Sequence, residues 1–280
     1  MAVDSNALMR IGVVAPGGRI ASDVEIKVQA LGAGLAPDRR PDIRFHPQCF
    51  LSSGHFAGDD AARAEAFVAV ANDPSVDAVW FARGGYGSFR LIDAVLPQLD
   101  AAAHDKTYLG YSDAGALLGA LYGAGIGRVV HGPMPADVNR VGGAAAVLRA
   151  LAFLADGAAP AQPLPTVAFN ITVLAHLIGT PHMPDLAGHV LMLEEVSEPM
   201  YRIDRALGQI VSALPNLAGI MLGRCSGIVA NDPDFGQTED DVARDWCARA
   251  GIPYLGRADI GHDADNAVVP FGTWPPQRFK

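Results

Sequence analysis

Two stretches in the first half of the chain decide the fold: residues 78–88, AVWFARGGYGS, and residues 107–122, TYLGYSDAGALLGALY. Each begins with a short apolar run that is typical of a buried strand and then turns at glycine. In the second stretch an apolar helical pattern follows the turn, starting at Ala114. Strands that alternate with helices in this way build a parallel sheet covered by helices. These residues therefore predict a doubly wound, mostly parallel α/β domain.

The same alternation extends along the chain. The further segments that we expect as strands are residues 11–15, 43–46, 190–193 and 219–222, and those that we expect as helices are residues 59–71, 171–177, 202–214 and 240–250. A connection rich in glycine, alanine and proline, residues 141–165, separates two halves of different character. We therefore expect an N-terminal domain over residues 1–140, this linker, and a smaller C-terminal α/β domain over residues 166–280.

The composition indicates a compact enzyme-like protein. Of the 280 residues 50% are hydrophobic and 18% are charged, which is too apolar for a disordered chain. The formal net charge is -9. A phosphate backbone or an anionic membrane does not attract such an acidic surface. We therefore expect neither nucleic acid nor a membrane as partner, and a small-molecule substrate is the default.

The expected compartment is the cytoplasm. Residues 1–10 lack the cationic start and the apolar run of about 7 to 15 residues that a signal peptide needs. No stretch of about 20 uninterrupted apolar residues occurs. The three cysteines, Cys49, Cys225 and Cys247, are odd in number and widely separated, unlike a disulfide framework or a zinc-ligand spacing. We therefore expect no metal site.

Ser112 is the first candidate catalytic residue. It stands where an expected strand turns into an expected helix, flanked by Gly110 and Asp113. A helix N-terminus offers free backbone N–H groups and a positive dipole, which suit a nucleophile and the oxyanion that its attack creates. The alternative is that Ser112 only caps the helix that begins at Ala114.

A second glycine turn, at residues 84–87, also follows an expected strand. Glycine allows backbone to approach a ligand closely, so this turn is a candidate wall of the oxyanion site. A dinucleotide motif G-x-G-x-x-G that starts at Gly85 would need glycine where Arg90 stands, and no Walker lysine follows. The remaining alternative is a tight turn without a ligand.

Two adjacent acids, Glu194 and Glu195, close the apolar run of residues 190–193. A carboxylate at the end of a buried strand can orient an imidazole, or it can simply be solvated at the strand end. Adjacent residues of a strand point to opposite faces, so only one of the two can reach a given imidazole. Periodicity alone leaves the choice open.

Among the eight histidines, His262 has the most site-like setting, in a polar turn ahead of an apolar run. His131, in the string HGPM, is its main rival. We expect His176, which lies on the helical pattern of residues 171–177, to be structural.

Five blocks of sequence together resemble one family. They are RGGYGS at residues 83–88, GYSD at 110–113, HGPM at 131–134, LEEV at 193–196 with YRIDR at 201–205, and GH at 261–262. Their order and placement resemble the LD-carboxypeptidases, serine peptidase family S66. The resemblance covers residues 11–272, nearly the whole chain. It departs where the family commonly carries Gly-Gly-Asn-Leu, because residues 168–171 here read AFNI.

The resemblance implies a triad of Ser112, Glu194 and His262, with an oxyanion hole made by the backbone amides of Gly85 and Asp113. It implies two lobes, with the serine in the first and its two partners in the second, and neither a metal nor a cofactor. The implied substrate is a murein tetrapeptide, cut between its L,D-diamino acid and the terminal D-alanine during cytoplasmic peptidoglycan recycling. Soluble family members are commonly dimers, so a homodimer is also an expectation.

A carboxypeptidase must also bind the terminal carboxylate of its substrate. Arg83 and Arg202 are candidates because each adjoins a block that carries the resemblance. Asn170 survives in the altered AFNI string and is a further candidate substrate-binding residue.

Three alternatives remain. The first, within the same family, is a self-immunity peptidase that hydrolyses a peptide-nucleotide antibiotic, for which Phe169 could stack on the base. The second, an α/β-hydrolase, would need the elbow G-x-S-x-G, and the chain has Ala114 in place of its last glycine. The third is a non-catalytic ligand-binding protein, against which all three triad candidates argue.

Overall fold

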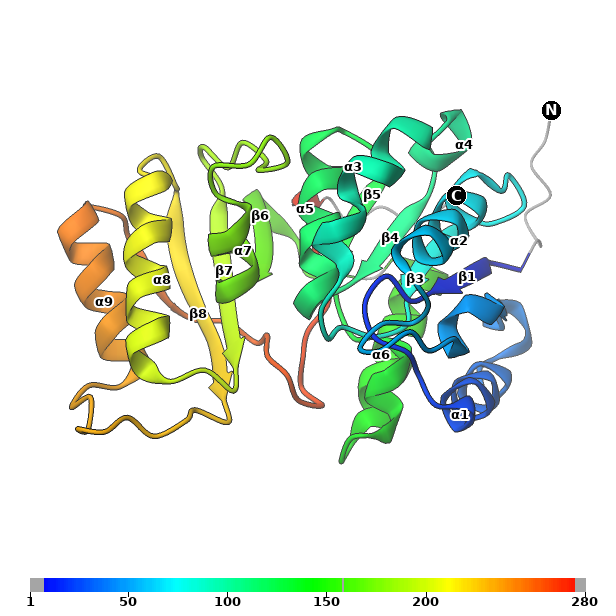
Figure 1. The fold of residues 1–280 in the computed structure, drawn as a ribbon, viewed down its shortest axis with the longest axis horizontal. Coiled ribbons are helices and arrows are strands. Elements are labelled where there is room, and N and C mark those ends of the chain that lie inside the picture. Colours follow the sequence, from blue (N-terminus) through cyan, green and yellow to red (C-terminus); the bar gives the residue numbers. More distant parts are fainter. Residues whose placement is uncertain (1–7, 158, 275–280) are drawn as a thin grey trace.

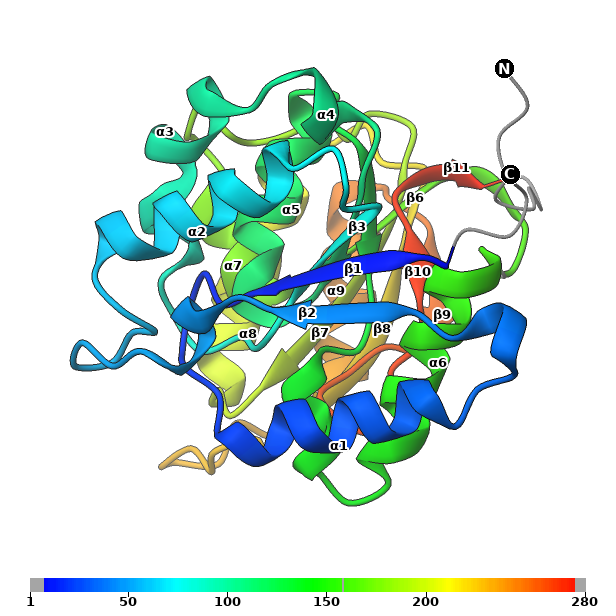
Figure 2. The ribbon, with the colours of Figure 1, turned by 90° about the vertical axis from the view of Figure 1, so that its right-hand side faces the viewer.

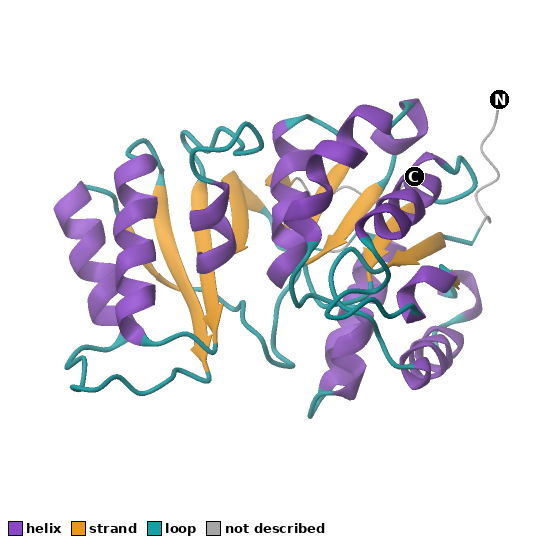
Figure 3. Cartoon of the chain, in the orientation of Figure 1, coloured by secondary structure: helices purple, strands orange, loops and turns teal. Residues whose placement is uncertain are grey.

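The computed structural model describes residues 8–157 and 159–274, and there the chain forms two α/β lobes that lie side by side (Figure 1). Each lobe is a mostly parallel sheet flanked by helices (Figure 3). This arrangement confirms the predicted α/β fold class. Residues 1–7, from which part of the compartment prediction came, lie outside the described residues.

The first sheet has six strands within the described residues, in the order β10-β5-β4-β3-β1-β2. Its strands are β1 (Arg10–Val14), β2 (Asp42–Phe45), β3 (Ala78–Phe81), β4 (Thr107–Gly110), β5 (Arg128–His131) and β10 (Val269–Pro270). The first five are parallel, and β10 is antiparallel to β5. The order reverses between β1 and β3, and loops at the carboxyl ends of strands beside such a switch point open a crevice for ligands.

Helices cover both faces of this sheet (Figure 2). On one face lie α1 (Ser22–Ala33) and α6 (Gly143–Asp156), and on the other lie α2 (Asp60–Asn72), α3 (Ile92–Val95), α4 (Ala101–His104) and α5 (Gly115–Gly123). Successive residues of a strand point to opposite faces of the sheet and so pack against different helices. In β3, Trp80 packs with α1 and α6, whereas its neighbour Phe81 packs with α2 and α5. This period of two explains why β3 is apolar throughout, since both of its faces are buried.

The second sheet has five strands within the described residues, in the order β11-β6-β7-β8-β9. Its strands are β6 (Gln162–Asn170), β7 (Val190–Val196), β8 (Gly219–Ser226), β9 (Tyr254–Arg257) and β11 (Gly272–Trp274). Helices α7 (Ile171–Leu177), α8 (Met200–Ala213) and α9 (Glu239–Ala250) line up along it (Figure 1).

The two lobes share one hydrophobic core. A single cluster of buried side chains includes Leu117 of α5 and Leu191 of β7. Helices α5 and α7 meet closely because α5 carries glycine at the contact: a Cβ on Gly119 would lie 3.0 Å from Leu177 Cδ1. The position of one lobe relative to the other is therefore set by packing.

The chain also crosses back from the second lobe to the first. After β9 it passes through His262 and then joins the first sheet as β10, where Val269 is paired with His131. This return of the chain places His262, in the polar turn 261–266, beside Ser112 at the carboxyl end of β4. No local pattern in the sequence predicts the return, because β10 pairs with β5, more than a hundred residues earlier in the chain.

The connecting segment, residues 141–165, is more ordered than its composition predicts. It contains α6, whose Val147, Leu151 and Leu154 are buried against the first lobe. The many glycine and alanine residues of this segment resemble a flexible linker in composition, so the apolar stripe of α6 was not recognised. The sequence also did not predict helices α1, α3 and α4 or strands β5, β6, β9, β10 and β11. No helix in the described part of the chain combines the length and apolarity needed to cross a membrane.

Candidate active site

Ser112 lies in a sharp turn between β4 and α5. Its φ is 60°, in the left-handed region that costs a residue with a side chain roughly 1–2 kcal/mol. Gly110, two residues earlier, has no room for a side chain, since a Cβ there would lie 2.7 Å from the Phe81 ring. This strained turn from strand to helix projects the Ser112 hydroxyl from the edge of the sheet, as a nucleophile elbow does.

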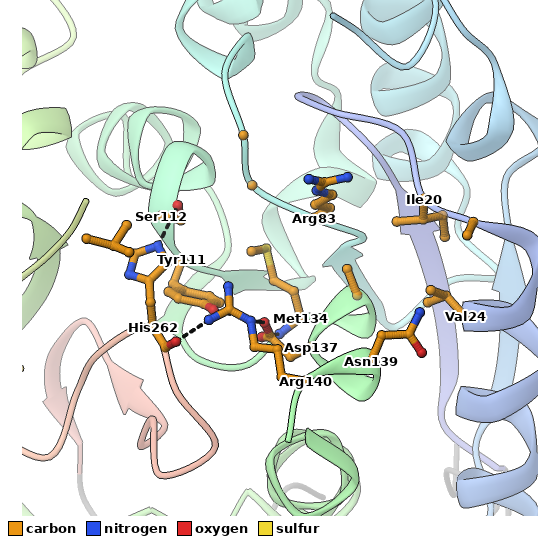
Figure 4. Close-up of a pocket in the computed structure, with 15 residues that line it drawn as sticks. Ile20, Val24, Arg83, Tyr111, Ser112, Met134, Asp137, Asn139, Arg140 and His262 are labelled. Atoms are coloured by element: carbon orange, nitrogen blue, oxygen red, sulfur yellow. Dashed lines mark hydrogen bonds and ion pairs between the residues drawn. The ribbon is translucent and has the colours of Figure 1, made fainter. Parts of the chain in front are cut away.

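His262 joins Ser112 to Glu194. The His262 Nε2 atom lies 2.9 Å from Ser112 Oγ (Figure 4), and its Nδ1 lies 2.6 Å from Glu194 Oε2. Because a carboxylate only accepts hydrogen bonds, Nδ1 carries the proton and Nε2 is left to accept from the hydroxyl. Glu194 is fully buried and the His262 side chain is 5% exposed. This chain of hydroxyl, imidazole and carboxylate can transfer the hydroxyl proton to the ring.

Glu195 points away from His262. Its carboxylate accepts hydrogen bonds from Asn170 Nδ2 (2.6 Å), Thr172 N (2.9 Å) and Thr172 Oγ1 (2.7 Å) at the start of α7. Burial raises the pKa of Glu195 above its usual value. The two acids of β7 therefore have different partners: the first faces the imidazole and the second anchors a helix.

His131, the rival histidine, is buried at the end of β5, and its side chain is hydrogen-bonded to Asn266 rather than to Ser112. Its Nε2 lies 3.0 Å from Asn266 Oδ1, which also accepts from Gly261 N at 3.1 Å. Burial lowers the pKa of His131 to about 4, so the ring is neutral near pH 7. His131 thus supports the turn that carries His262.

Two backbone amides next to Ser112 are free. Within residues 8–157 and 159–274 neither Gly85 N nor Asp113 N donates a hydrogen bond. The turn at residues 84–87 lies so close to the serine that a Cβ on Gly84 would be 2.8 Å from Ser112 Oγ. Free amides within reach of a nucleophile are what an oxyanion site requires.

A cavity of about 500 Å³ opens in front of Ser112 and His262 (Figure 4). It extends across the carboxyl ends of β1, β3 and β4 towards α1, in the place that the switch point predicts. Its apolar side is formed by Ile20, Val24 and Met134. Its polar side carries two arginines, Arg83 and Arg140.

Of the three candidate substrate-binding residues, Arg83, Arg202 and Asn170, one lines the cavity and two do not. Arg83 lines the cavity. Arg202 does not: it lies on the exposed side of α8 and pairs with Glu198 at 3.2 Å. Asn170 is also away from the cavity, because it is buried and caps α7 by accepting from Val173 N.

Arg140 was not singled out from the sequence. It donates a hydrogen bond to the backbone carbonyl of His262 (Figure 4), and its Nε lies 3.0 Å from Asp137 Oδ1. It therefore ties the histidine turn of the second lobe to the first lobe. No local pattern could have revealed it, since its partner is a main-chain atom 122 residues away.

Among the described residues, no three side chains of His, Cys, Asp and Glu are arranged to hold a metal ion. The reactive groups that the site brings together are the Ser112 hydroxyl, the His262 imidazole and the Glu194 carboxylate. Together with the fold, it places the protein among the serine-type hydrolases.

Residues 11–132 match the sequence model of the LD-carboxypeptidase N-terminal domain, and residues 165–275 match that of the C-terminal domain. The chain belongs to the LD-carboxypeptidases, peptidase family S66. It is 33% identical to a putative carboxypeptidase of Streptomyces coelicolor over 94% of this chain and 88% of that one. It is 29% identical to the murein tetrapeptide carboxypeptidase of Pseudomonas aeruginosa, with 94% and 91% of the two chains covered.

Solved structures show the same fold. A crystal structure of muramoyltetrapeptide carboxypeptidase from Oxalobacter formigenes is similar with a TM-score of 0.77 and 27% identity, covering 93% of each chain. The microcin C7 self-immunity protein MccF, solved in complex with aspartyl sulfamoyl adenosine, has a TM-score of 0.75 at 16% identity over 95% of this chain and 92% of that one. The second likeness is one of fold alone.

Proposed function

We propose that this protein is a serine carboxypeptidase that releases the terminal D-alanine from a murein tetrapeptide, with Ser112, His262 and Glu194 as its catalytic residues. The observation that carries the proposal is the hydrogen-bonded chain from Glu194 through His262 to Ser112, with distances of 2.6 and 2.9 Å. The names of the two murein peptidases to which the chain is similar support the substrate. As part of the same proposal, the reaction belongs to peptidoglycan recycling in the cytoplasm.

The first half of the proposed reaction forms an acyl-enzyme. Ser112 Oγ attacks the carbonyl carbon of the L,D amide bond while His262 Nε2 takes the hydroxyl proton. The carbonyl oxygen becomes an oxyanion and accepts hydrogen bonds from the Gly85 and Asp113 amides. The C–N bond then breaks, and His262 returns its proton to the nitrogen of the leaving D-alanine.

The second half consumes one water molecule. The imidazole of His262 takes a proton from this water, whose oxygen attacks the ester carbonyl of the acyl-enzyme. The ester bond breaks, the proton returns to Ser112 Oγ, and a shortened peptide with a new carboxylate leaves. Throughout, Glu194 holds the ring in one orientation and stabilises its cationic form.

Arg83 is our candidate for the residue that binds the terminal carboxylate. Its guanidinium lines the cavity, and its one hydrogen bond within the described residues goes to the carbonyl of Arg19 at 3.2 Å. Arg140, the other arginine of the cavity, is already engaged by Asp137 and by the His262 carbonyl. Arg83 therefore has donors to spare for a planar carboxylate.

The surroundings of Phe169 argue against a peptide-nucleotide substrate. The MccF relatives of this fold have been solved with sulfamoyl nucleosides. Phe169 is only 1% exposed here, and its ring packs 5.2 Å from that of Phe271. Among the described residues that line the cavity, Tyr111 is the one aromatic residue besides His262. Tyr111 is also only 1% exposed. Of the described lining residues, none besides His262 thus offers an exposed aromatic ring to a base.

The direct test is incubation with murein tripeptide, tetrapeptide and pentapeptide, followed by mass measurement of the products. We expect the tetrapeptide alone to lose the mass of one alanine residue. Cleavage of an aminoacyl sulfamoyl nucleoside without cleavage of the tetrapeptide would overturn the proposed substrate. Treatment with a fluorophosphonate reports separately whether Ser112 is nucleophilic.

A further inference from the structure

The turn at residues 84–87 is held by a buried carboxylate that the proposed mechanism does not use. Asp113 Oδ1 accepts from Gly87 N at 3.1 Å, and its Oδ2 accepts from Ser88 N at 2.9 Å and from Ser88 Oγ at 2.7 Å. Asp113 is 6% exposed. Three donors converge on this carboxylate, so the turn uses most of its capacity to accept hydrogen bonds.

A buried cation holds the same turn from the opposite side. Arg63 of α2 donates through Nη1 to Gly87 O at 3.1 Å, and also to the carbonyl of Pro16. Arg63 is 1% exposed. The contact depends on glycine, since a Cβ on Gly87 would lie 2.6 Å from Arg63 Nη1. The N–H and the C=O of Gly87 are therefore bound by charges of opposite sign.

This turn needs external support because its backbone is unusual. Gly85 and Gly87 have φ values of 103° and 138°, in a region that glycine enters and leaves freely. An oxyanion site acts only if its donors are already in place when charge develops. A glycine turn without anchors would spend much of its time with the Gly85 amide turned elsewhere.

The position of Asp113 links the two halves of the site. Its backbone amide follows Ser112 directly and is one of the two free N–H groups, while its side chain holds the turn that carries the other. Asp113 thus connects the turn that carries Ser112 directly to the turn that carries the Gly85 amide.

We propose that Asp113 is a positioning residue, and Arg63 its opposite anchor, which together hold the Gly85 amide over Ser112 so that both amides bind one oxyanion. This inference rests on the proposed function. It predicts that the two side chains affect the stabilisation of the transition state and leave the binding of the peptide nearly unchanged.

The test compares Asp113→Asn, Ser88→Ala and Arg63→Met with the wild-type protein. Asn replaces one acceptor oxygen with an N–H group that faces other donors, so it weakens the hold on the turn while keeping the side-chain shape. We expect kcat for the tetrapeptide to fall about 100-fold in Asp113→Asn, the order seen when one oxyanion donor is lost, with KM within threefold. Arg63→Met should lose kcat in the same way, and Ser88→Ala, which removes one of three bonds, should lose less.

Two measurements separate positioning from simple destabilisation. Val211→Ala is the control for stability, because it leaves a cavity at a buried side chain of α8 in the second lobe. Assayed well below its unfolding temperature, this variant should keep the wild-type kcat. The labelling rate of Ser112 by a fluorophosphonate should fall in parallel with kcat in Asp113→Asn, because phosphonylation of the serine develops negative charge on an oxygen that the same two amides bind.

The outcomes distinguish the two proposals. If wild type is labelled but does not cleave the tetrapeptide, the proposed substrate is wrong, and the labelling rates still test the positioning role. If wild type is not labelled, both proposals are overturned. A kcat and labelling rate within threefold of wild type in Asp113→Asn would overturn the positioning role alone, and normal values in Arg63→Met would remove Arg63 from it.

Discussion

Glu194 Oε2 lies 2.6 Å from His262 Nδ1, whereas Glu195, the next residue of the same strand, binds Asn170 and Thr172 on another side. Successive side chains of a strand point to opposite faces, so the register of β7 decides which acid meets the imidazole. The two glutamates are thus a matched pair, with the same chemistry, both buried, and different partners.

Glu194→Gln should lose kcat by about 10⁴, the order observed when the orienting acid of a serine triad becomes an amide and the imidazole takes the wrong tautomer. Glu195→Gln should lose far less activity and should mainly lower the unfolding temperature, because an amide cannot accept all the bonds that Glu195 receives. Both are measured with the murein tetrapeptide at neutral pH. A severe loss confined to Glu195→Gln would reverse the assignment, and mild losses in both would remove glutamate from the triad.

Ser112→Ala should abolish turnover and leave the protein folded. The left-handed backbone of this position adds a second expectation: Ser112→Gly should be equally inactive but more stable than Ser112→Ala by roughly 1 kcal/mol, because glycine is not strained at this φ. Denaturant unfolding of the two variants measures the difference. Activity of either variant within tenfold of wild type would contradict the role of Ser112.

The protein should lose stability as the pH falls below about 6.5. The pKa of His131 is about 4 in the fold, so the unfolded chain binds a proton on this residue between the two values while the folded protein does not. The contribution is complete above 6.5 and falls by roughly 1 kcal/mol between pH 7.5 and 5.5. His131→Asn should flatten the pH dependence of the unfolding free energy in this window, and an unchanged slope would show that His131 titrates normally.

Arg83→Ala should raise KM and lower kcat/KM by about 10- to 100-fold, the effect of losing hydrogen bonds to a charged group. Arg202→Ala is the control: its guanidinium also carries charge near a family block, but it pairs with Glu198 outside the cavity. A tetrapeptide with an amidated C-terminus should react poorly with wild type and no worse with Arg83→Ala. Equal losses of kcat/KM in the two arginine variants would contradict the role of Arg83 in binding the terminal carboxylate of the substrate.

Dialysis against EDTA should leave kcat unchanged. The proposed reaction uses a serine nucleophile and an imidazole base, and none of its steps requires a Lewis acid. The assay compares dialysed protein with dialysed protein to which zinc is restored. Loss of activity on dialysis with recovery on addition of zinc would show that the chemistry has been misassigned.

The sequence alone predicted much of the first lobe. Apolar runs such as residues 78–82 identify buried strands because both faces of a central parallel strand are covered. The helical spacing of apolar residues over 59–71 identifies α2, which the structure places at Asp60–Asn72. Ser112 and His262 could be singled out because a nucleophile turn and a polar turn have local signatures. The mostly parallel α/β fold in two lobes follows from the same local patterns and is confirmed.

Other features depend on contacts that no local pattern records. Arg140 binds a backbone carbonyl, and Asn170 supports Glu195 rather than lining the cavity, because the packing of β6, β7 and α7 directs its side chain there. Helix α6 was obscured by its alanines. The distinction between Arg83 and Arg202 depends on which of them faces the cavity.

The residues that could do chemistry were thus determined by the sequence, whereas their assembly was decided by the tertiary structure. Ser112 and His262 are 150 residues apart, and they meet only because α5 packs on α7 and the chain returns from the second sheet to pair as β10 with β5. The choice between Glu194 and Glu195 follows from the register of one strand. Register and lobe packing are properties of the whole buried core, so a short stretch of sequence cannot specify them.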